Sequence, residues 1–156
     1  KANTVIEGPA YIGPGCEIGY GNVLRGPVNI EQNVKTGAFC EIKHSIFQEG
    51  AHTHSGYFGD SVVGSNCRFG VGFISANKRI DRGTVMCEVK GKKLDTKLQA
   101  FGFVAGPDAK FGIHAGTMPG ILVGSGAVVG PDTHVIENVP DNTTVFVAPT
   151  IKKKKQ

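Results

Sequence analysis

The sequence lacks any apolar run long enough to span a membrane, and no signal peptide opens it. It also has little net charge apart from its C-terminal residues, because a run of four lysines, Lys152 to Lys155, accounts for the net charge of +4. Without that run the charges nearly balance, which leaves little support for a nucleic-acid partner. We therefore expect a cytoplasmic protein that binds neither membranes nor nucleic acids, and a lysine run that is solvated.

Cysteine is also scarce, and its spacing fits no metal motif. Each of the four cysteines is separated from the next by twenty residues or more, whereas zinc sites place pairs of ligands a few residues apart. We expect reduced thiols packed in the interior, with Cys16 and Cys40 in the same inward register. No metal site is predicted.

What the sequence does contain is a period of six. Isoleucine, leucine or threonine recurs at Ile6, Ile12, Ile18, Leu24, Ile30, Thr36 and Ile42. A second register of mostly small or apolar residues follows four positions later, and both registers return between Ala105 and Val135. Neither a helix nor an alternating strand has this period. A parallel β-helix does, with one short strand and one tight turn per hexapeptide, so the predicted fold class is all-β.

The repeat divides a single hexapeptide-repeat domain, 1–156, into blocks. Two stretches interrupt the period and are predicted to be inserted loops, at about 47–60 and 75–102. Alternating residues followed by Gly91 predict a hairpin arm in the second loop. Insertions in solenoids gather on one face, often the binding face. The other blocks are the first repeats at 5–46, later coils at 61–74 and 103–137, and a tail at 138–156 with one strand near 144–148.

One pair of cations repeats with the period of a coil. Three hexapeptides make one triangular coil, so residues eighteen apart should stack about 4.8 Å from one another along the axis. Arg25 and Lys43 stand at this spacing, each just after an inward residue. Stacked cations repel each other unless an anion lies against them, and a phosphate would satisfy both. Alternatively, Glu7, one coil earlier, neutralises Arg25 in a solvated column. The spacing alone favours neither interpretation.

His54 lies in the first interrupted stretch and is a candidate general base. Imidazole titrates near neutral pH, and loops on rigid scaffolds often carry chemistry. The alternative is an exposed loop histidine without a function, which the residues alone favour. His52, two positions earlier, raises a metal site as a further alternative, but no third histidine stands in an evident constellation with this pair.

Three stretches together resemble a known family. They are Leu24-Arg25-Gly26-Pro27, Phe39-Cys40-Glu41-Ile42-Lys43 and His54-Ser55-Gly56-Tyr57-Phe58-Gly59-Asp60. Over nearly its whole length the chain is similar to the acetyltransferase domain of the bifunctional glucosamine-1-phosphate acetyltransferase/uridylyltransferases, and most similar to archaeal-type sugar-1-phosphate nucleotidylyltransferases. The resemblance implies a left-handed parallel β-helix, a homotrimer, and acetyl-CoA and sugar-phosphate sites in clefts between subunits.

The resemblance also implies roles for individual residues. His54 matches the general base that takes a proton from the sugar amine as the amine attacks the acetyl thioester. Arg25 and Lys43 match the residues that hold the sugar phosphate. The remaining matches are Tyr57 beside the sugar, Asn77 near the acyl-transfer centre, and Val71 with Asn77-Lys78 near the coenzyme. No covalent enzyme intermediate is needed.

Two residues depart from the family's pattern. Arg68 replaces a sugar-contacting asparagine, so we assign it to the substrate site, where it could fill the pocket or bind a more acidic substrate. Phe73 replaces a threonine and should narrow the same wall. Both favour an alternative function, a non-catalytic β-helix that trimerises or regulates an attached nucleotidylyltransferase. A γ-type carbonic anhydrase on the same scaffold would need three converging histidines and is the weakest of the three interpretations.

The predicted function is an acetyl-CoA-dependent N-acetyltransferase in nucleotide-sugar biosynthesis. Its acceptor is an amino-sugar 1-phosphate, either glucosamine 1-phosphate or galactosamine 1-phosphate. The Gly-rich nucleotide-binding segment of a uridylyltransferase is absent from the sequence. We expect the chain to be the C-terminal part of a longer protein with an N-terminal nucleotidylyltransferase domain.

Overall fold

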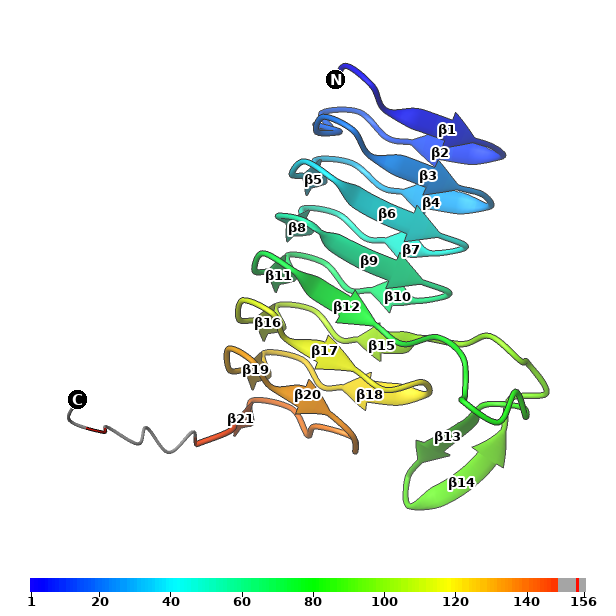
Figure 1. Ribbon diagram of the computed structural model, residues 1–156, viewed down its shortest axis with the longest axis vertical. Helices are drawn as coiled ribbons and strands as arrows, with labels where there is room; N and C mark the ends of the chain where they lie inside the picture. Colours follow the sequence, from blue (N-terminus) through cyan, green and yellow to red (C-terminus); the bar gives the residue numbers. More distant parts are fainter. Residues whose placement is uncertain (149–153, 155–156) are drawn as a thin grey trace.

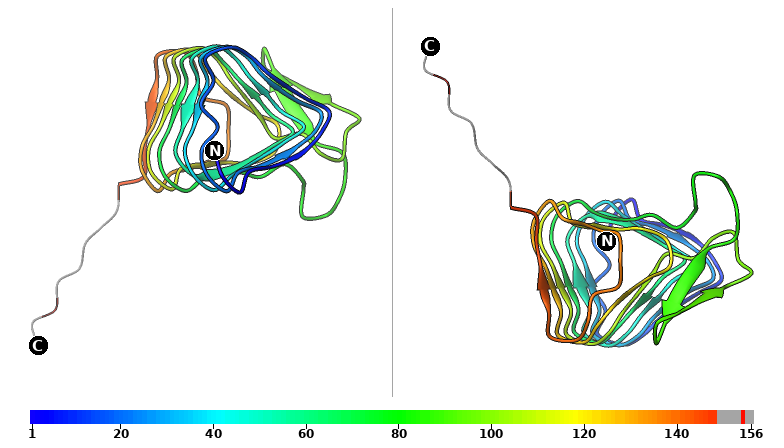
Figure 2. Two further views of the ribbon diagram at one scale, coloured as in Figure 1. Left: turned by 90° about the horizontal axis from the view of Figure 1, so that it is seen from above. Right: turned by 90° about the horizontal axis from the view of Figure 1, so that it is seen from below.

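The chain forms a solenoid of short parallel strands with a triangular cross-section (Figures 1 and 2). The computed structural model describes residues 1–148 and 154, and these contain no α-helix. The coils wind left-handed from the N-terminus toward the C-terminal segment at the opposite end (Figure 1). The predicted left-handed parallel β-helix is confirmed. The predicted solvation of the lysine run falls, apart from exposed Lys154, outside the described residues.

Each side of the triangle is one parallel sheet. Sheet A consists of β1 (Val5–Glu7), β3 (Val23–Arg25), β6 (Cys40–Lys43), β9 (Gly56–Gly59), β12 (Phe73–Ser75), β17 (Gly116–Thr117) and β20 (His134–Val135). Sheet B consists of β2 (Ala10–Ile12), β4 (Val28–Ile30), β7 (Ile46–Phe47), β10 (Val62–Val63), β15 (Phe103–Ala105) and β18 (Ile121–Val123). Sheet C consists of β5 (Lys35–Thr36), β8 (His52–Thr53), β11 (Arg68–Phe69), β16 (Lys110–Phe111), β19 (Val128–Val129) and β21 (Thr144–Val145).

The inward side chains form a continuous apolar core along the solenoid. Its middle coils are filled by the phenylalanines Phe47, Phe58, Phe69, Phe73, Phe103 and Phe111. The rings of Phe58 and Phe73 stack at 5.0 Å, and those of Phe69 and Phe111 stack at 4.5 Å. Such aromatic pairs each contribute about 0.5–1.5 kcal/mol beyond the area that they bury.

Phe73 belongs to this core, so the prediction that it narrows the wall of a ligand pocket is wrong. Its side chain is completely buried. Strand pairing places Phe73 next to Gly56 at an inward position. Because Gly56 has no side chain there, the interior has room for a phenyl ring in a register that is otherwise filled by small residues such as Cys40.

Residues 47–60 continue the regular solenoid, so the prediction of an inserted loop in this stretch is also wrong. Strands β8 and β9 lie within it and pair with the coils on both sides. The corners of this coil lose single residues, so that Ile42 pairs with Phe58, sixteen residues later instead of eighteen. One residue is lost at the corner with His44 and one between β8 and β9. His44 has a positive φ of 46°, and Asp60, at the stacked corner one coil later, has a φ of 51°.

Residues 75–102 form the predicted insertion. The chain leaves the solenoid after β12 and returns at β15, and between them β13 (Met86–Val89) and β14 (Lys92–Asp95) pair antiparallel as a hairpin arm. The backbone N–H of Phe101 donates to the carbonyl oxygen of Asn77 at 2.8 Å and closes the base of the insertion. Figure 1 shows the arm projecting from the solenoid beside β18.

The cysteines are free thiols, and Cys40 and Cys67 are buried in the solenoid core. Burial raises the pKa of both thiols to about 11. Cys16 is half-buried, whereas Cys87 is buried in the arm rather than in the solenoid. Among the described residues, no helix is long and apolar enough to cross a membrane.

Candidate functional site

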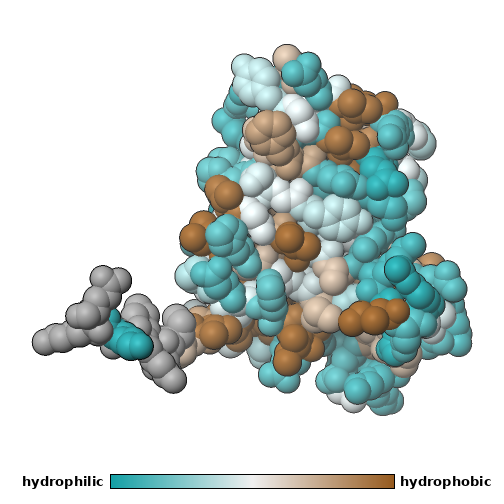
Figure 3. All heavy atoms as spheres, in the orientation of Figure 1, coloured by the Kyte–Doolittle hydropathy of each residue, from teal (hydrophilic) through white to brown (hydrophobic). Residues whose placement is uncertain are grey.

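The predicted site residues fall into two groups at opposite edges of sheet A. Arg25, Lys43 and Asn77 lie at the edge where strands of sheet A end and the chain turns toward sheet B. His54 lies at the edge next to sheet C, and Arg68 lies in β11 of sheet C itself. Figure 3 shows the face of the molecule in the view of Figure 1, where apolar and hydrophilic side chains alternate instead of forming one large apolar area.

Arg25 is surrounded by carboxylates at the first edge. It lies next to Lys43 in the adjacent strand, which confirms the predicted stacking. Its guanidinium donates to Glu41 at 2.7 Å and lies 3.7 Å from Glu7. The hydrogen bond to Glu41, and then the charge of that carboxylate, raises the pKa of Arg25 above its usual value. The structure thus contains the Glu7 contact of the solvated alternative together with a second, shorter carboxylate contact.

Lys43 has its own carboxylate partner. Its Nζ donates to Asp60 Oδ2 at 3.0 Å, and the two side chains are only 17% and 13% exposed. Asp60 also bonds to His44 at 3.2 Å and accepts a hydrogen bond from Asn77. Burial acts to raise the pKa of Asp60, but the hydrogen bonds from Asn77 and Lys43 outweigh it and hold this pKa below its usual value. We call Glu7, Arg25, Glu41, Lys43 and Asp60 the acid-paired cluster.

Tyr57 and Asn77 lie beside this cluster. A Cβ on Gly59 would lie 2.5 Å from the Tyr57 hydroxyl and 2.8 Å from Asn77 Nδ2, so both polar groups converge over a residue that has no side chain. Burial, followed by the charges of Glu41 and Asp60, raises the pKa of the Tyr57 phenol. Tyr57 is therefore a neutral hydroxyl that can donate or accept a hydrogen bond at neutral pH.

His54 lies at the other edge, between β8 and β9, and its side chain is exposed. Its backbone is held by the Cys40 thiol, which donates to the His54 carbonyl oxygen at 2.7 Å, and by the bond from His54 N–H to the carbonyl oxygen of Phe69 at 3.2 Å. The imidazole rings of His54 and His52 lie 5.6 Å apart. The candidate base is thus an accessible ring on a fixed backbone.

A row of basic residues runs past His54 on the outer face of sheet C. Strand pairing stacks them in successive coils, and we call this set the basic strip: Lys35, His52, Arg68 and Lys110. Arg68 Nη1 lies 2.7 Å from His52 Nδ1. A guanidinium only donates, so His52 accepts here and is neutral. Burial, and then the charge of Arg68, lowers the pKa of His52.

The two groups do not form one pocket within a single chain. The four-residue strand β9 separates His54 from the acid-paired cluster, and four extended residues span about 13 Å. Val71 is exposed at the corner before β12, and Lys78 is exposed at the start of the insertion. The structure therefore brings Lys43, Tyr57 and Asn77 together and His54 near Arg68, but it does not bring these two sets into contact.

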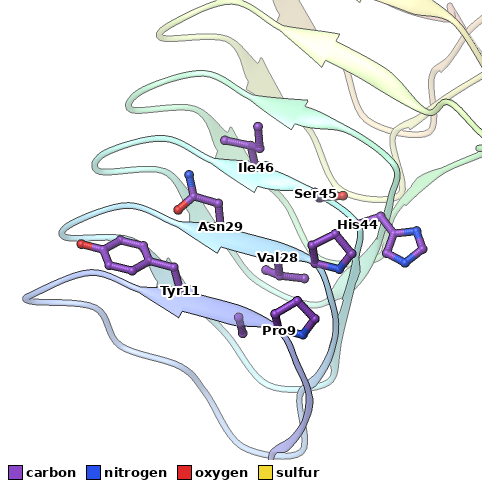
Figure 4. A pocket seen from close by; sticks show the side chains of 9 residues that line it. Pro9, Tyr11, Val28, Asn29, His44, Ser45 and Ile46 are labelled. Carbon is purple, nitrogen blue, oxygen red and sulfur yellow. The ribbon is translucent and has the colours of Figure 1, made fainter.

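An apolar hollow on sheet B contains none of the predicted site residues. Figure 4 shows its lining by Pro9, Tyr11, Val28 and Ile46, with His44 at its edge. His44 connects the hollow to the cluster through its bond to Asp60. Within the described part of the chain, no group of three histidine, cysteine, aspartate or glutamate side chains is arranged to hold a metal ion.

The sequence analysis missed the groups that pair with the predicted residues. Asp60 and Glu41 both stand in the stretches that carry the family resemblance, yet neither was assigned a role. Lys110 lies against Arg68, forty-two residues later, because the insertion separates the two coils. Aligning the repeats on the two sides of the insertion with each other is the signal that could have found Lys110.

Comparison with known proteins agrees with the fold. No family model matches the chain. It is 35% identical over 148 residues to the bifunctional protein GlmU of Methanococcus vannielii, covering 94% of this chain and 34% of the relative. It is 37% identical over 140 residues to a bifunctional sugar-1-phosphate nucleotidylyltransferase/acetyltransferase of Sulfurisphaera tokodaii, covering 89% and 35%. The chain thus spans about a third of the length of these curated relatives.

Two solved structures show the same architecture. The polysialic acid O-acetyltransferase OatWY superposes with a TM-score of 0.63 at 14% identity, covering 99% of this chain and 89% of that one. A mutant of AntD, an N-acyltransferase from Bacillus cereus, superposes with a TM-score of 0.52 at 17% identity, covering 97% and 77%. At these identities the likeness shows the fold alone.

The fold defines the class of protein, a left-handed parallel β-helix of hexapeptide repeats, which these solved structures share. Within that class the chain is a relative of the bifunctional GlmU proteins over about a third of their length, and the resemblance predicted from the sequence is confirmed.

Proposed function

We propose that the chain is an acetyl-CoA-dependent N-acetyltransferase that acts in the cytoplasm on an amino-sugar 1-phosphate. The observation that carries this proposal is the exposed imidazole of His54 on a fixed backbone. The relatives of the chain support the reaction class, since one of them is a bifunctional sugar-1-phosphate nucleotidylyltransferase/acetyltransferase. The acceptor is glucosamine 1-phosphate or galactosamine 1-phosphate, and a nucleotidylyltransferase domain accompanies the chain in the full-length protein.

The reaction needs one proton acceptor and a positioned amine. The sugar nitrogen attacks the acetyl carbonyl carbon, a C–N bond forms, and the C–S bond to coenzyme A breaks. His54 takes the proton that the nitrogen loses and can return it to the departing thiolate. Tyr57 and Asn77 supply neutral hydrogen-bonding groups for the sugar. Exclusion of water would strengthen each of these contacts.

A second copy of the chain would complete the site. His54 and the acid-paired cluster lie at opposite edges of sheet A, too far apart to hold one small acceptor. In a homotrimer, the His54 edge of one subunit can face the Lys43 edge of its neighbour, so that base and phosphate ligands meet between subunits. Sedimentation analysis should then give a trimer, and a monomer that retains full turnover would contradict this arrangement.

The carboxylate partners of Arg25 and Lys43 favour a second candidate function. Both cations already have carboxylate partners, so a phosphate must compete with Glu41 and Asp60. A non-catalytic β-helix that trimerises or regulates an attached nucleotidylyltransferase would need only these internal pairs.

Release of coenzyme A decides between the two functions. Acetyl-CoA and either amino-sugar 1-phosphate are supplied, and the free thiol is titrated. Cys40 and Cys67 should add little background, because their pKa values of about 11 keep them protonated. We expect turnover that falls about 10²- to 10⁴-fold in His54→Ala. His134→Ala, which removes another exposed histidine, in β20 of sheet A, serves as the control. A folded trimer without turnover would favour the scaffold.

A further inference from the structure

The basic strip carries positive charge that the described carboxylates leave unneutralised. Lys35 is paired with Glu17 at 2.6 Å. Within residues 1–148, however, no carboxylate lies within salt-bridge distance of Arg68 or Lys110. These two cations are exposed and lie opposite each other in adjacent strands. Like charges stacked in this way repel each other, so an anion that contacts both is favoured.

The guanidinium of Arg68 is already oriented. His52 fixes one N–H through the 2.7 Å contact with Nδ1, which leaves the other N–H groups of the fork for a ligand. Because His52 is neutral, the contact costs Arg68 none of its charge. An oriented fork beside an ammonium suits phosphate oxygens, which accept two parallel hydrogen bonds from arginine and a further one from lysine.

The column of residues beside these cations consists of glycine in most coils, where a Cβ would collide with the backbone of the next coil. Gly37, Gly70 and Gly112 each follow the inward residue of their strand in sheet C. The exception in this column is His54, which follows Thr53. His54 therefore brings a side chain, its imidazole, to this column on the strand connection one coil before Arg68.

We propose that Arg68 and Lys110 form a binding site for the phosphate groups of a ligand that lies against His54. The ligand's purpose there rests on the proposed function, but its binding does not. Two ligands of that reaction carry the required chemistry, the coenzyme with its diphosphate and the acceptor with its sugar phosphate. The site is distinct from Arg25 and Lys43, where carboxylates already occupy the cations.

Equilibrium binding to the whole chain tests the proposal without turnover. Titration calorimetry uses pyrophosphate, coenzyme A and glucosamine 1-phosphate as probes, with pantetheine and glucosamine as their phosphate-free counterparts. Lys110→Glu is the sharpest variant, because it gives Arg68 a carboxylate neighbour and reproduces the pairing of Arg25 while the fold is preserved. Arg68→Gln removes the fork. Lys92→Gln, at an exposed lysine of the arm, matches the change in net charge of Arg68→Gln.

We expect Lys110→Glu and Arg68→Gln each to weaken pyrophosphate about tenfold, the loss of one charge-assisted contact, and Lys92→Gln to change it less than twofold. If the variants weaken the binding of coenzyme A equally but do not weaken that of pantetheine, the site binds the phosphates of the acetyl donor. If they weaken the binding of glucosamine 1-phosphate equally but do not weaken that of glucosamine, the site binds the phosphate of the acceptor sugar. Unchanged affinity for all phosphate probes in both variants would overturn the site, whatever the outcome for turnover.

Discussion

The acid-paired cluster and the basic strip use the same geometry and differ in their counterions. Both stack basic side chains at outward positions of successive coils. At the edge of sheet A, Glu41 and Asp60 meet Arg25 and Lys43. On sheet C, Arg68 contacts a neutral histidine, and neither Arg68 nor Lys110 has a carboxylate within salt-bridge distance in residues 1–148.

The difference teaches that the side chains around a stack of cations decide whether its positive charge is neutralised. A β-helix brings outward residues of successive coils close together regardless of their charge, because the backbone sets the spacing. Neutralisation therefore depends on the neighbouring positions. Glu41 stands two residues before Lys43 on the same strand, and Asp60 stands at the corner one coil later. Where no carboxylate lies within reach among the described residues, as at Arg68 and Lys110, the stack keeps its charge and can bind an external anion.

The largest expected effect tests whether the acid-paired cluster is structural. Asp60→Asn should lower the free energy of unfolding by about 1–3 kcal/mol, because it leaves the largely buried Lys43 ammonium without a charged acceptor. Arg68→Gln should change this free energy by less than about 0.5 kcal/mol, since Arg68 is exposed. The chain has no tryptophan, so urea unfolding is followed by circular dichroism. Equal losses in the two variants would remove the distinction between the regions.

The period of six was sufficient to predict the fold because it follows from the backbone. Every coil repeats the same strand and turn, so Ile6, Leu24 and Ile42 identify the inward register directly. The stacking of Arg25 on Lys43 follows from the same spacing and is observed. The predicted loop at 47–60 was wrong because corners can shed a residue, as at His44 and between β8 and β9, without breaking strand pairing.

The partners of the site residues were harder to predict. Asp60 meets Lys43 only because the shortened coil brings a corner residue over the previous strand. Phe73 was placed at the site although Gly56 beneath it makes its position part of the core. Strand register decides both cases, and composition does not reveal a register that changes by one residue.

A smaller effect should follow from making the two regions alike. Glu41→Gln removes the carboxylate that bonds Arg25 at 2.7 Å, so the cluster should bind pyrophosphate about two- to fivefold more tightly, the equivalent of one exposed ion pair. The measurement uses Arg68→Gln as the background, so that the basic strip does not contribute. Glu31→Gln is the control for a lost surface carboxylate. Unchanged affinity would show that carboxylate pairing does not limit anion binding at Arg25.

The smallest expected effect is a pH dependence that separates the regions. The pKa of His52 is lowered by burial and by Arg68, so the folded protein disfavours its protonation. Its contribution to stability is fully present above the unfolded pKa of about 6.5 and is lost as the pH falls through the lower folded pKa. Asp60, whose pKa is also lowered, loses its contribution only below about pH 4, as carboxyl groups protonate.

The urea midpoint of the wild type should therefore decline as the pH falls below about 6.5, and His52→Gln should remove part of that decline. Glutamine keeps a side-chain oxygen that can accept from Arg68 but cannot be protonated in this range. His134→Gln removes another exposed histidine of the solenoid and should leave the decline unchanged. If His52→Gln and His134→Gln behave alike, the contact between Arg68 and His52 does not distinguish protonation states, and the guanidinium lacks the neutral anchor that orients it toward a phosphate.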